Sequence, residues 1–187
     1  MSLSTSRTQK LETIRSALKV RSRAGKKPWE ALCVYDLAEK FGFEVRFVEI
    51  PSLEAMYFNQ EPPTIIISTL RPDGRRRFNC AHEMGHHYLN HGTKIDEYLL
   101  QSDASRRGNE LLADLFAANL LMPKTAIDHA LSSRGWDANK LLPIQAYTIS
   151  CWLGVGYTTL ISHMRYTLRY LTEERTNQLQ KVRPKEI

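Results

Sequence analysis

Residues 80–87 read Cys80-Ala81-His82-Glu83-Met84-Gly85-His86-His87 and contain the pattern His-Glu-x-x-His. Residues four apart lie one above the other on a helix, so His82 and His86 would offer two imidazole nitrogens to one metal ion. Zinc accepts imidazole ligands, and a catalytic zinc site keeps one coordination position for water. Glu83 is the natural general base for that water. This stretch therefore predicts a helix that carries a metal site and a catalytic glutamate.

A third protein ligand is expected on the apolar helix formed by residues 109–122, which ends at Pro123. A helix this apolar should be largely buried, and a buried carboxylate needs a partner. Glu110 and Asp114 are four apart and share one face. We expect Glu110, with its longer side chain, to bind the metal and Asp114 to accept the free ring N–H of a liganding histidine. The alternative is a glutamate favoured by the helix dipole together with an incidental aspartate.

These two segments together resemble the ImmA/IrrE-type zinc metallo-endopeptidases. The resemblance extends from about residue 29 to about residue 165 and is most specific over residues 77–123. The matching stretches are Arg77-Phe78, Ala81-His82-Glu83-Met84-Gly85-His86, His91, and the segment from Glu110 to Pro123. The chain departs from the family pattern at Asn90, which is inserted between Leu89 and His91, and at Asn79 and Cys80, where Thr and Leu are commoner.

The resemblance implies a small gluzincin-like fold in which His82, His86 and Glu110 bind zinc and Glu83 acts as the base. It also implies cytoplasmic proteolysis of a helix-turn-helix repressor or antitoxin in a prophage, mobile element or stress-response pair, which would relieve transcriptional repression. The rival interpretation is a non-catalytic regulator that keeps the zincin fold and binds DNA or sequesters a repressor. The intact base and ligand set favours the peptidase. The sequence predicts no particular oligomeric state.

His91 and Tyr88 are weaker candidates for the site. A metzincin would place a third histidine ten residues after His82, where this chain has Gly92. His91 follows His82 by nine residues, about a quarter-turn off the ligand face at roughly 100° per residue. We expect His91 and Tyr88 to be packing or polar residues, with stabilisation of a reaction intermediate as the alternative role. Three acids in the segment between the two helices are expected to lie in a loop rather than to bind metal: Asp96, Glu97 and Asp103.

Length and cysteine content limit the class of protein. A chain of 187 residues forms one compact domain, or a domain with a small appendage. Cys33, Cys80 and Cys151 are odd in number and scattered, which is typical of reduced thiols rather than of a disulfide scaffold. We find no apolar stretch long enough for a membrane span and no apolar core of a signal peptide, so a cytoplasmic protein is expected.

Positive charge is concentrated at the N-terminus. The net charge is +6, yet residues 1–27 contain eight Lys or Arg and a single acid, so the rest of the chain is close to neutral. Leu11, Ile14 and Leu18 predict an amphipathic helix with a basic outer face. Such a face can bind nucleic acid or an acidic partner, but a solvated surface is the favoured interpretation.

The chain divides into a basic N-terminal helix (1–27), a zincin-like catalytic domain (28–135) and a helical C-terminal region (136–187). Within the catalytic domain we expect a helix over 29–41, a half-buried strand over 43–50, a strand pair over 55–59 and 64–69, and a turn at 71–74. This order predicts an α+β fold, with a small antiparallel or mixed sheet packed on the His-Glu-x-x-His helix and on the second ligand-bearing helix. One edge of that sheet could hold an extended peptide by backbone pairing.

The C-terminal region has the spacing of a helix-turn-helix. Residues 144–153 and 157–165 predict two helices joined by Gly154-Val155-Gly156. The second helix carries a single cation, Arg165, whereas a DNA-reading helix normally carries more. We therefore favour packing or repressor docking over DNA binding for this unit. The polar tail over 172–187 is expected to fray.

Overall fold

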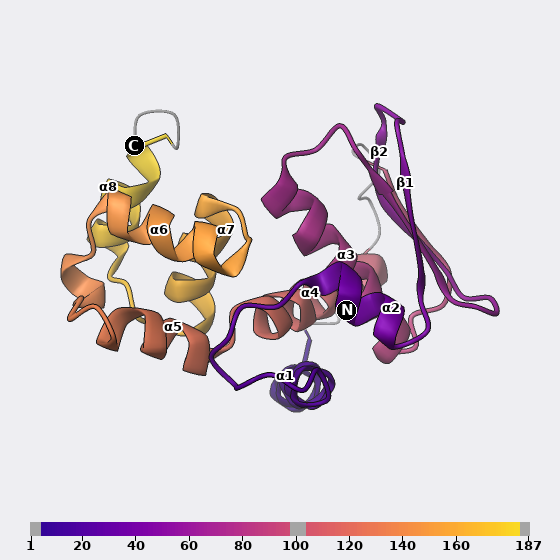
Figure 1. The fold of residues 1–187 in the computed structure, drawn as a ribbon, viewed down its shortest axis with the longest axis horizontal. Coiled ribbons are helices and arrows are strands. Elements are labelled where there is room, and N and C mark those ends of the chain that lie inside the picture. The colour runs from indigo at the N-terminus through magenta and orange to yellow at the C-terminus, as the bar shows by residue number, and fades with distance from the viewer. Residues whose placement is uncertain (1–4, 98–103, 184–187) are drawn as a thin grey trace.

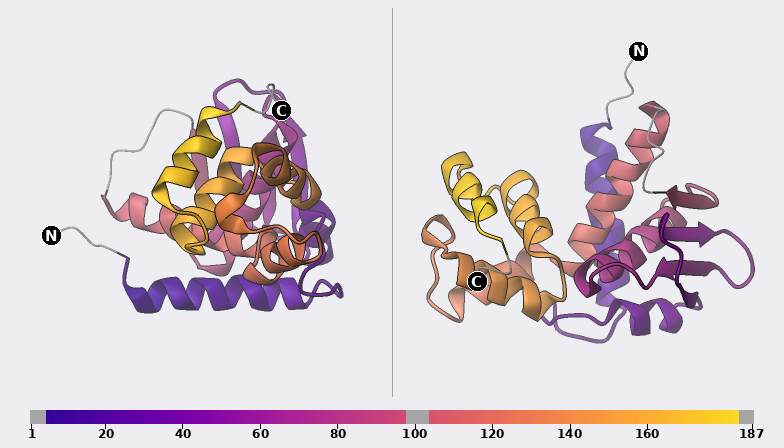
Figure 2. Two further views of the ribbon diagram at one scale, coloured as in Figure 1. Left: turned by 90° about the vertical axis from the view of Figure 1, so that its left-hand side faces the viewer. Right: turned by 90° about the horizontal axis from the view of Figure 1, so that it is seen from above.

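The computed structural model describes residues 5–97 and 104–183. Within them a four-stranded mixed sheet packs against helices on one face, and a group of C-terminal helices lies beyond the far end of helix α4 (Figures 1 and 2). This is the α+β architecture that the sequence predicts. The strands are β1 (Glu44–Val48), β2 (Leu53–Phe58), β3 (Thr64–Ser68) and β4 (Lys94–Glu97). The helices are α1 (Arg7–Ser22), α2 (Val34–Lys40), α3 (Asp73–Tyr88), α4 (Ala104–Leu121), α5 (Lys124–Ser132), η1 (Ala138–Lys140), α6 (Pro143–Leu153), α7 (Tyr157–Ser162), the π-turn η2 (His163–Thr167) and α8 (Glu173–Lys181).

The sheet has the strand order β1-β3-β2-β4. β1 pairs in parallel with β3, whereas β2 is antiparallel to both β3 and β4. Ala55 and Tyr57 on β2 lie opposite Ile67 and Ile65 on β3, and all four are almost completely buried. Because the Tyr57 hydroxyl contacts His87 of α3, this buried face of the sheet is the one that packs on the predicted metal-binding helix.

Strand β4 contradicts the loop expected before α4. Asp96 and Glu97 lie in this strand, and Asp103 lies outside the described residues. A segment of four residues that is mostly polar carries no clear strand pattern. Its strand conformation depends on backbone pairing with β2, a contact between residues distant in sequence.

Two helix starts also differ from the prediction. α2 begins at Val34, several residues later than expected, because residues 28–30 form a turn. α3 begins earlier, at Asp73, with Pro72 as its N-cap. Asp73 lies in the first turn, where the helix dipole favours a negative charge, and its carboxylate pairs with Arg77 at 2.7 Å. The segment that reads as a turn in sequence is therefore the start of the helix.

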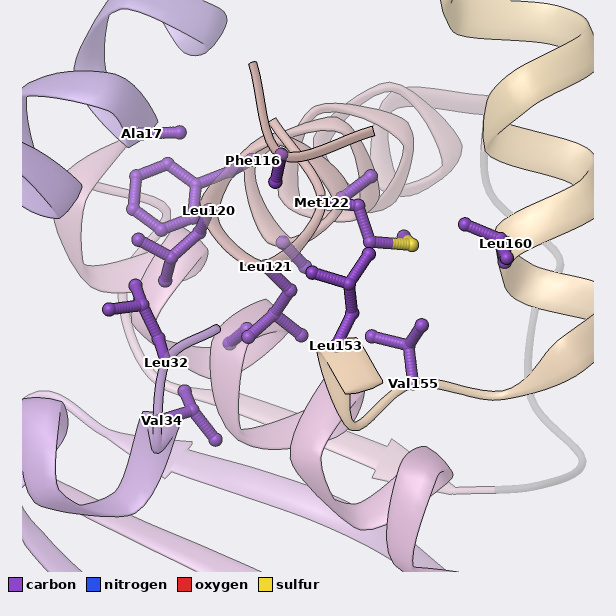
Figure 3. Packing of buried hydrophobic residues seen from close by; sticks show 14 of the residues in the cluster. Ala17, Leu32, Val34, Phe116, Leu120, Leu121, Met122, Leu153, Val155 and Leu160 are labelled. Carbon is purple, nitrogen blue, oxygen red and sulfur yellow. The ribbon is translucent and has the colours of Figure 1, made fainter. Parts of the chain in front are cut away.

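The second half of α4 forms the centre of the hydrophobic core. Phe116, Leu120 and Leu121 are almost completely buried, as is Met122 directly after the helix. Figure 3 shows Ala17 of α1 on one side of this helix and Leu160 of α7 on the other. One helix therefore contributes to the core of the N-terminal and C-terminal parts of the chain.

α1 forms as predicted, but its buried face was predicted wrongly. Leu11 and Leu18 are 46% and 42% exposed, whereas Thr13, Ala17 and Val20 are buried. α1 packs directly on α4, and the small side chain of Ala17 on this side of α1 is completely buried (Figure 3). The larger leucines therefore lie outside the interface.

Arg21 is the one cation of the α1 segment that is buried. Its guanidinium donates to the backbone oxygen of Leu120 at the end of α4, at 2.7 Å, and to that of Pro28 at 3.2 Å. A further hydrogen bond reaches the backbone oxygen of Glu30. Burial lowers the pKa of Arg21 to about 10, partly offset by Glu30, so the side chain stays charged at neutral pH. Arg21 thus ties α1 and the following loop to the end of α4.

We expect Arg21→Met to destabilise the fold by about 2–3 kcal/mol, because one buried and two partly buried backbone carbonyls lose their donor. Urea unfolding measures the change. The control Arg15→Met removes an exposed cation from the same helix and should stay within about 0.5 kcal/mol of the natural chain. Equal stability of the two variants would show that Arg21 does not hold these elements together.

The C-terminal helices have the predicted helix-turn-helix spacing, with α6 and α7 joined by Gly154-Val155-Gly156. The prediction of a frayed tail was wrong for the residues that form α8. Thr172 caps this helix, Leu179 is buried, and the Tyr157 hydroxyl donates to the backbone oxygen of Leu179 at 3.0 Å. Residues 184–187 lie outside the described residues. In the described part of the chain, no helix combines the length and apolar character needed to cross a membrane.

The segment that joins α6 and α7 packs directly on the first turn of helix α3. A Cβ added at Gly74 would lie 2.7 Å from the backbone of Val155 and Gly156. The Arg77 guanidinium lies against Gly154, whose φ of +68° is readily adopted by glycine. The C-terminal unit is therefore fixed to the helix that carries the His-Glu-x-x-His pattern.

His163 gives a second buried polar link, between η2 and the end of α4. Its Nε2 lies 2.9 Å from the backbone oxygen of Met122, and the residue is 4% exposed. Burial lowers the pKa of His163 to about 4, partly offset by the Met122 carbonyl. The folded chain therefore holds this imidazole in its neutral form at neutral pH.

Folding stability should consequently fall in acid. Between the ordinary pKa of 6.5 and the folded pKa of about 4, the unfolded chain binds a proton that the folded chain does not. This contribution is complete above the upper value and is lost as the pH falls towards the lower one. We expect the metal-free protein to lose about 2 kcal/mol more than His163→Gln between about pH 7 and about pH 4.5, measured by urea unfolding. The control Asn139→Gln, at an exposed residue that does not titrate, should keep the pH dependence of the natural chain. Identical profiles for the natural chain and His163→Gln would exclude this effect.

Candidate metal centre

Helix α3 presents two imidazoles on one face. His82 and His86 are 8% and 0% exposed, and their Nε2 atoms lie 3.0 Å apart. The spacing of four residues puts both rings on the same side of the helix, as the sequence predicts. Two ring nitrogens this close can share at most one proton between them, so at least one of them offers a lone pair.

Glu110 brings a carboxylate from α4 to the same point. Its Oε2 lies 3.0 Å from His82 Nε2 and 3.4 Å from His86 Nε2. The close approach depends on Gly85, because a Cβ there would lie 3.2 Å from the backbone of Ala113 and 3.3 Å from Phe116 Cβ. A glycine between the two histidines therefore allows α4 to come near enough for Glu110 to reach them.

The three donors fit a metal ion. His82, His86 and Glu110 each offer one ligand atom, and these atoms all lie within 4.8 Å of one another. Tetrahedral ligands at about 2.0–2.1 Å from zinc are roughly 3.3 Å apart, close to the separations of 3.0–3.4 Å seen here. A single cation would satisfy both nitrogen lone pairs and the carboxylate together. The geometry is thus compatible with a metal, and the donor set suits zinc.

The outer nitrogen of each imidazole also has a partner. His82 Nδ1 donates to Asp114 Oδ1 at 2.8 Å, which leaves Nε2 to face the cluster. His86 Nδ1 lies 2.9 Å from His91 Nδ1. Asp114 therefore occupies the position expected from the sequence, and His91 takes the equivalent place behind the other histidine.

A Schellman turn at the end of α3 positions His91. The His91 N–H donates to the His86 carbonyl at 2.9 Å, and the Asn90 N–H donates to the His87 carbonyl at 3.1 Å. Asn90 has a φ of 56°, the left-handed conformation that asparagine tolerates better than most residues. The extra Asn90 that separates Leu89 from His91 is thus the residue that reverses the chain and returns His91 to His86.

The acid–base state of the site follows from its partners. Burial alone would raise the pKa of Glu110, but hydrogen bonds from His82 and His86 outweigh it and hold this pKa below its ordinary range. Glu110 is therefore an anion, as a carboxylate ligand must be. Burial raises the pKa of the Cys80 thiol, and the nearby Glu83 adds to the shift. Cys80 thus stays neutral and acts as a packing residue.

The other candidate site residues, Glu83, Tyr88 and His91, lie at different positions relative to the donor atoms. Glu83 is completely buried, one residue along α3 from His82. Tyr88 stacks on Phe116 with ring centroids 5.7 Å apart, on the opposite side of α3 from the two ligands, so the structure does not bring it to the donor atoms. The contact of His91 with His86 favours a positioning role over the stabilising role considered from the sequence.

A polar cluster beside the site was not anticipated. The Glu54 carboxylate on β2 accepts from Arg75 Nε at 2.7 Å and from Asn79 Nδ2 at 3.1 Å, and it pairs with Arg71 at 2.8 Å. Asn79 lies one turn before His82, so the cluster ties the metal-binding face of α3 to β2. The sequence gives little indication of it, because Glu54 lies in a strand far from the His-Glu-x-x-His segment.

Comparison with known proteins agrees with this geometry. Residues 38–160, well over half of the chain, match the IrrE N-terminal-like domain of the peptidase M78 family. The chain belongs to this family. It thus has a metallopeptidase-type site, and its predicted ImmA/IrrE relationship is confirmed. No curated protein matches the sequence closely enough to add a relative of known activity.

A solved transcriptional regulator from Mycobacterium tuberculosis shares the fold of this M78-family protein. The TM-score is 0.54 and the sequence identity 15%, over 83% of this chain and 46% of the regulator. This chain therefore spans less than half the length of the regulator, and at such low identity the likeness concerns the fold alone.

For this M78-family protein, the positions of Glu110 and Asp114 predict unequal effects on metal binding. We expect Glu110→Ala to lose nearly all zinc retention, whereas Asp114→Ala and His91→Ala should weaken binding by about 10–100-fold, because they only orient a ligand. Titration against a chromogenic chelator measures the three affinities. The control Glu39→Ala, at an exposed helical glutamate, should bind as the natural chain does. If Asp114→Ala had the larger effect, the roles of the two acids would have to be exchanged.

Proposed function

We propose that this protein is a zinc-dependent endopeptidase that cleaves a cytoplasmic helix-turn-helix repressor or antitoxin and so relieves transcriptional repression. The observation that carries the proposal is the convergence of His82, His86 and Glu110, next to a buried Glu83, in a chain of a peptidase family. The same set of groups hydrolyses peptide bonds in zinc proteases of the His-Glu-x-x-His type.

Each residue has a defined task in this mechanism. A zinc ion held by the three donors would supply Lewis acidity towards water and the scissile carbonyl. Glu83 removes the proton from the attacking water and passes it to the amine of the leaving peptide, so one carboxylate serves as base and then as acid. Asp114 and His91 keep the two imidazoles oriented through their outer nitrogens.

The sheet offers a place for an extended substrate. β4 is an edge strand that pairs with β2 on one side only. Asn79 on the metal-binding face of α3 contacts Glu54 of β2, which places the site next to β2 and its neighbour. A peptide added along the outer edge of β4 would be held by backbone hydrogen bonds independent of its sequence. This arrangement supports a protein substrate rather than a small molecule.

The catalytic role of Glu83 has a direct test. We expect Glu83→Gln, which keeps the size of the side chain but cannot accept the proton, to bind zinc yet leave a co-expressed partner repressor uncut. The first partner to try is a small helix-turn-helix protein encoded in the neighbouring reading frame. Immunoblotting of the partner measures its loss, and a chelator titration confirms the zinc affinity of the variant.

The control for this test is Glu39→Gln, which changes an exposed glutamate and should cleave normally. Cleavage by Glu83→Gln at the rate of the natural chain would contradict the mechanism. Cleavage that persists after zinc is removed, and that does not increase when zinc is added back, would contradict the proposed role of the metal in catalysis.

A DNA-binding regulator is the second candidate function. It is favoured by the helix-turn-helix spacing of α6 and α7 and by the fold shared with a transcriptional regulator. The basic outer face of α1 would supply phosphate contacts. Duplex affinity that falls steeply with salt, and that is lost when the exposed Lys and Arg residues of α1 are neutralised, would support it. Zinc-dependent loss of the partner without any DNA binding would remove it.

A further inference from the structure

A groove next to the metal cluster is not used by the mechanism above. It is a cavity of about 760 Å³ between α1 and α4 on one side and α7 and η2 on the other. Seen from above in Figure 2, α1 and α4 lie side by side, and α7 lies in the C-terminal group of helices across from them. We call it the α1–α7 groove; its main apolar lining residues are Ile14, Phe78, Leu111, Leu115 and Tyr166.

The lining combines exposed apolar side chains with positive charge. Leu111 and Tyr166 are 58% and 74% exposed, so both side chains are accessible to a ligand in the groove. Lys10 and Arg169 also line the groove, and Asp114 is the one acid among its described lining residues. A matching ligand would therefore present an apolar stripe together with carboxylates.

His163 adds a polar group that lacks a partner. Its Nε2 contacts the Met122 carbonyl, while its Nδ1 is buried and has no hydrogen-bond partner among the described residues. The residue lines the groove at the start of the π-turn η2, and π-turns inside helices occur often at functional sites. A hydroxyl or N–H of a bound ligand would satisfy this nitrogen.

The shape of the groove favours protein over duplex DNA. Thr158, Thr159 and Ser162 on the outer face of α7 all line this cavity, opposite α1 and α4. A recognition helix must project from the surface to enter a major groove about 12 Å wide. A single α-helix, about 10–12 Å across with its side chains, is a ligand of more suitable size.

The groove also reaches the metal site. Asp114 lines it and accepts a hydrogen bond from His82, whose Nδ1 lies 2.8 Å from Asp114 Oδ1. A segment docked in the groove would hold the adjoining chain close to the metal donors and so raise its effective concentration there.

We propose that the α1–α7 groove is the docking site for an acidic amphipathic helix of the protein substrate, an inference that rests on the proposed endopeptidase function. The apolar stripe of this helix packs on Leu111 and Tyr166, and its carboxylates face Lys10 and Arg169. The segment of the substrate that the groove recognises is then different from the segment that contains the cleaved peptide bond.

The test measures binding without turnover, on the 187-residue Glu83→Gln chain loaded with zinc. The probe is a fluorescein-labelled helical peptide of about 18 residues, long enough to form a helix, with leucines along one face and flanking glutamates. We expect Tyr166→Ala and Lys10→Glu each to weaken its binding by about tenfold, as measured by fluorescence anisotropy. A peptide with lysines in place of the glutamates should bind about tenfold more weakly.

Matched controls come from exposed residues that do not line the groove. Lys19→Glu reverses another exposed charge of α1, and Leu142→Ala shortens another exposed apolar side chain; both should bind the probe as the Glu83→Gln parent does. Equal unfolding midpoints show that all variants remain folded. No binding of the probe, or binding insensitive to Tyr166→Ala and Lys10→Glu, would overturn the proposal. Duplex DNA binding lost in these two variants would also overturn it, by assigning the groove to nucleic acid.

The outcome is independent of catalysis. If the natural chain cleaves no partner but the probe binds as described, the proposed peptidase function fails, and the groove remains a binding site for an acidic helix but not for a substrate. If a partner is cleaved at the same rate and with the same KM by Tyr166→Ala and the natural chain, the docking proposal fails and the peptidase function stands.

Discussion

The close crossing of α3 and α4 is the constraint on which the metal site depends. A glycine at position 85 lets the backbone of Ala113 approach to a distance that any larger residue would oppose. Because Gly85 lies between the two histidine ligands, the closest point of the crossing coincides with the site. Glu110, one turn before Ala113, then has only a short distance to reach His82 and His86. The ligand set is therefore a consequence of helix packing as much as of ligand chemistry.

The same helix serves the site and the core. The first turns of α4 supply Glu110 and Asp114, while its second half supplies fully buried side chains such as Phe116 and Leu120 (Figure 3). The end of this helix is held by two buried polar links, from Arg21 of α1 and from His163 of η2. Displacement of α4 would thus be opposed from both parts of the chain. This rigidity suits a site that requires accurate placement of three ligand atoms.

Each histidine ligand is oriented by a partner that comes from a different local structure. Asp114 reaches His82 from the neighbouring helix, whereas His91 returns to His86 through the turn that ends α3. The left-handed Asn90 makes this return possible, so a departure from the family pattern has a structural purpose. The pair of helices α6 and α7 is also fixed to α3, through close contacts at Gly74 and Gly154. The outer face of α7 therefore does not project from the surface; it forms one wall of the groove.

The sequence by itself determined the features that depend on local periodicity and chemistry. His-Glu-x-x-His fixes two ligands on one helical face, and the apolar pattern of residues 109–122 identifies a buried helix in which Glu110 and Asp114 need partners. The α+β order and the helix-turn-helix spacing are read in the same way. Only the tertiary structure decided features that arise from contacts between distant segments. Strand β4 exists through pairing with β2, α1 buries Ala17 rather than Leu18 because α4 lies so close, and α8 is held by contacts with Tyr157. His91 lies behind His86 because of the turn that follows α3. Helical spacing in the sequence does not predict this position, because the helix ends before His91.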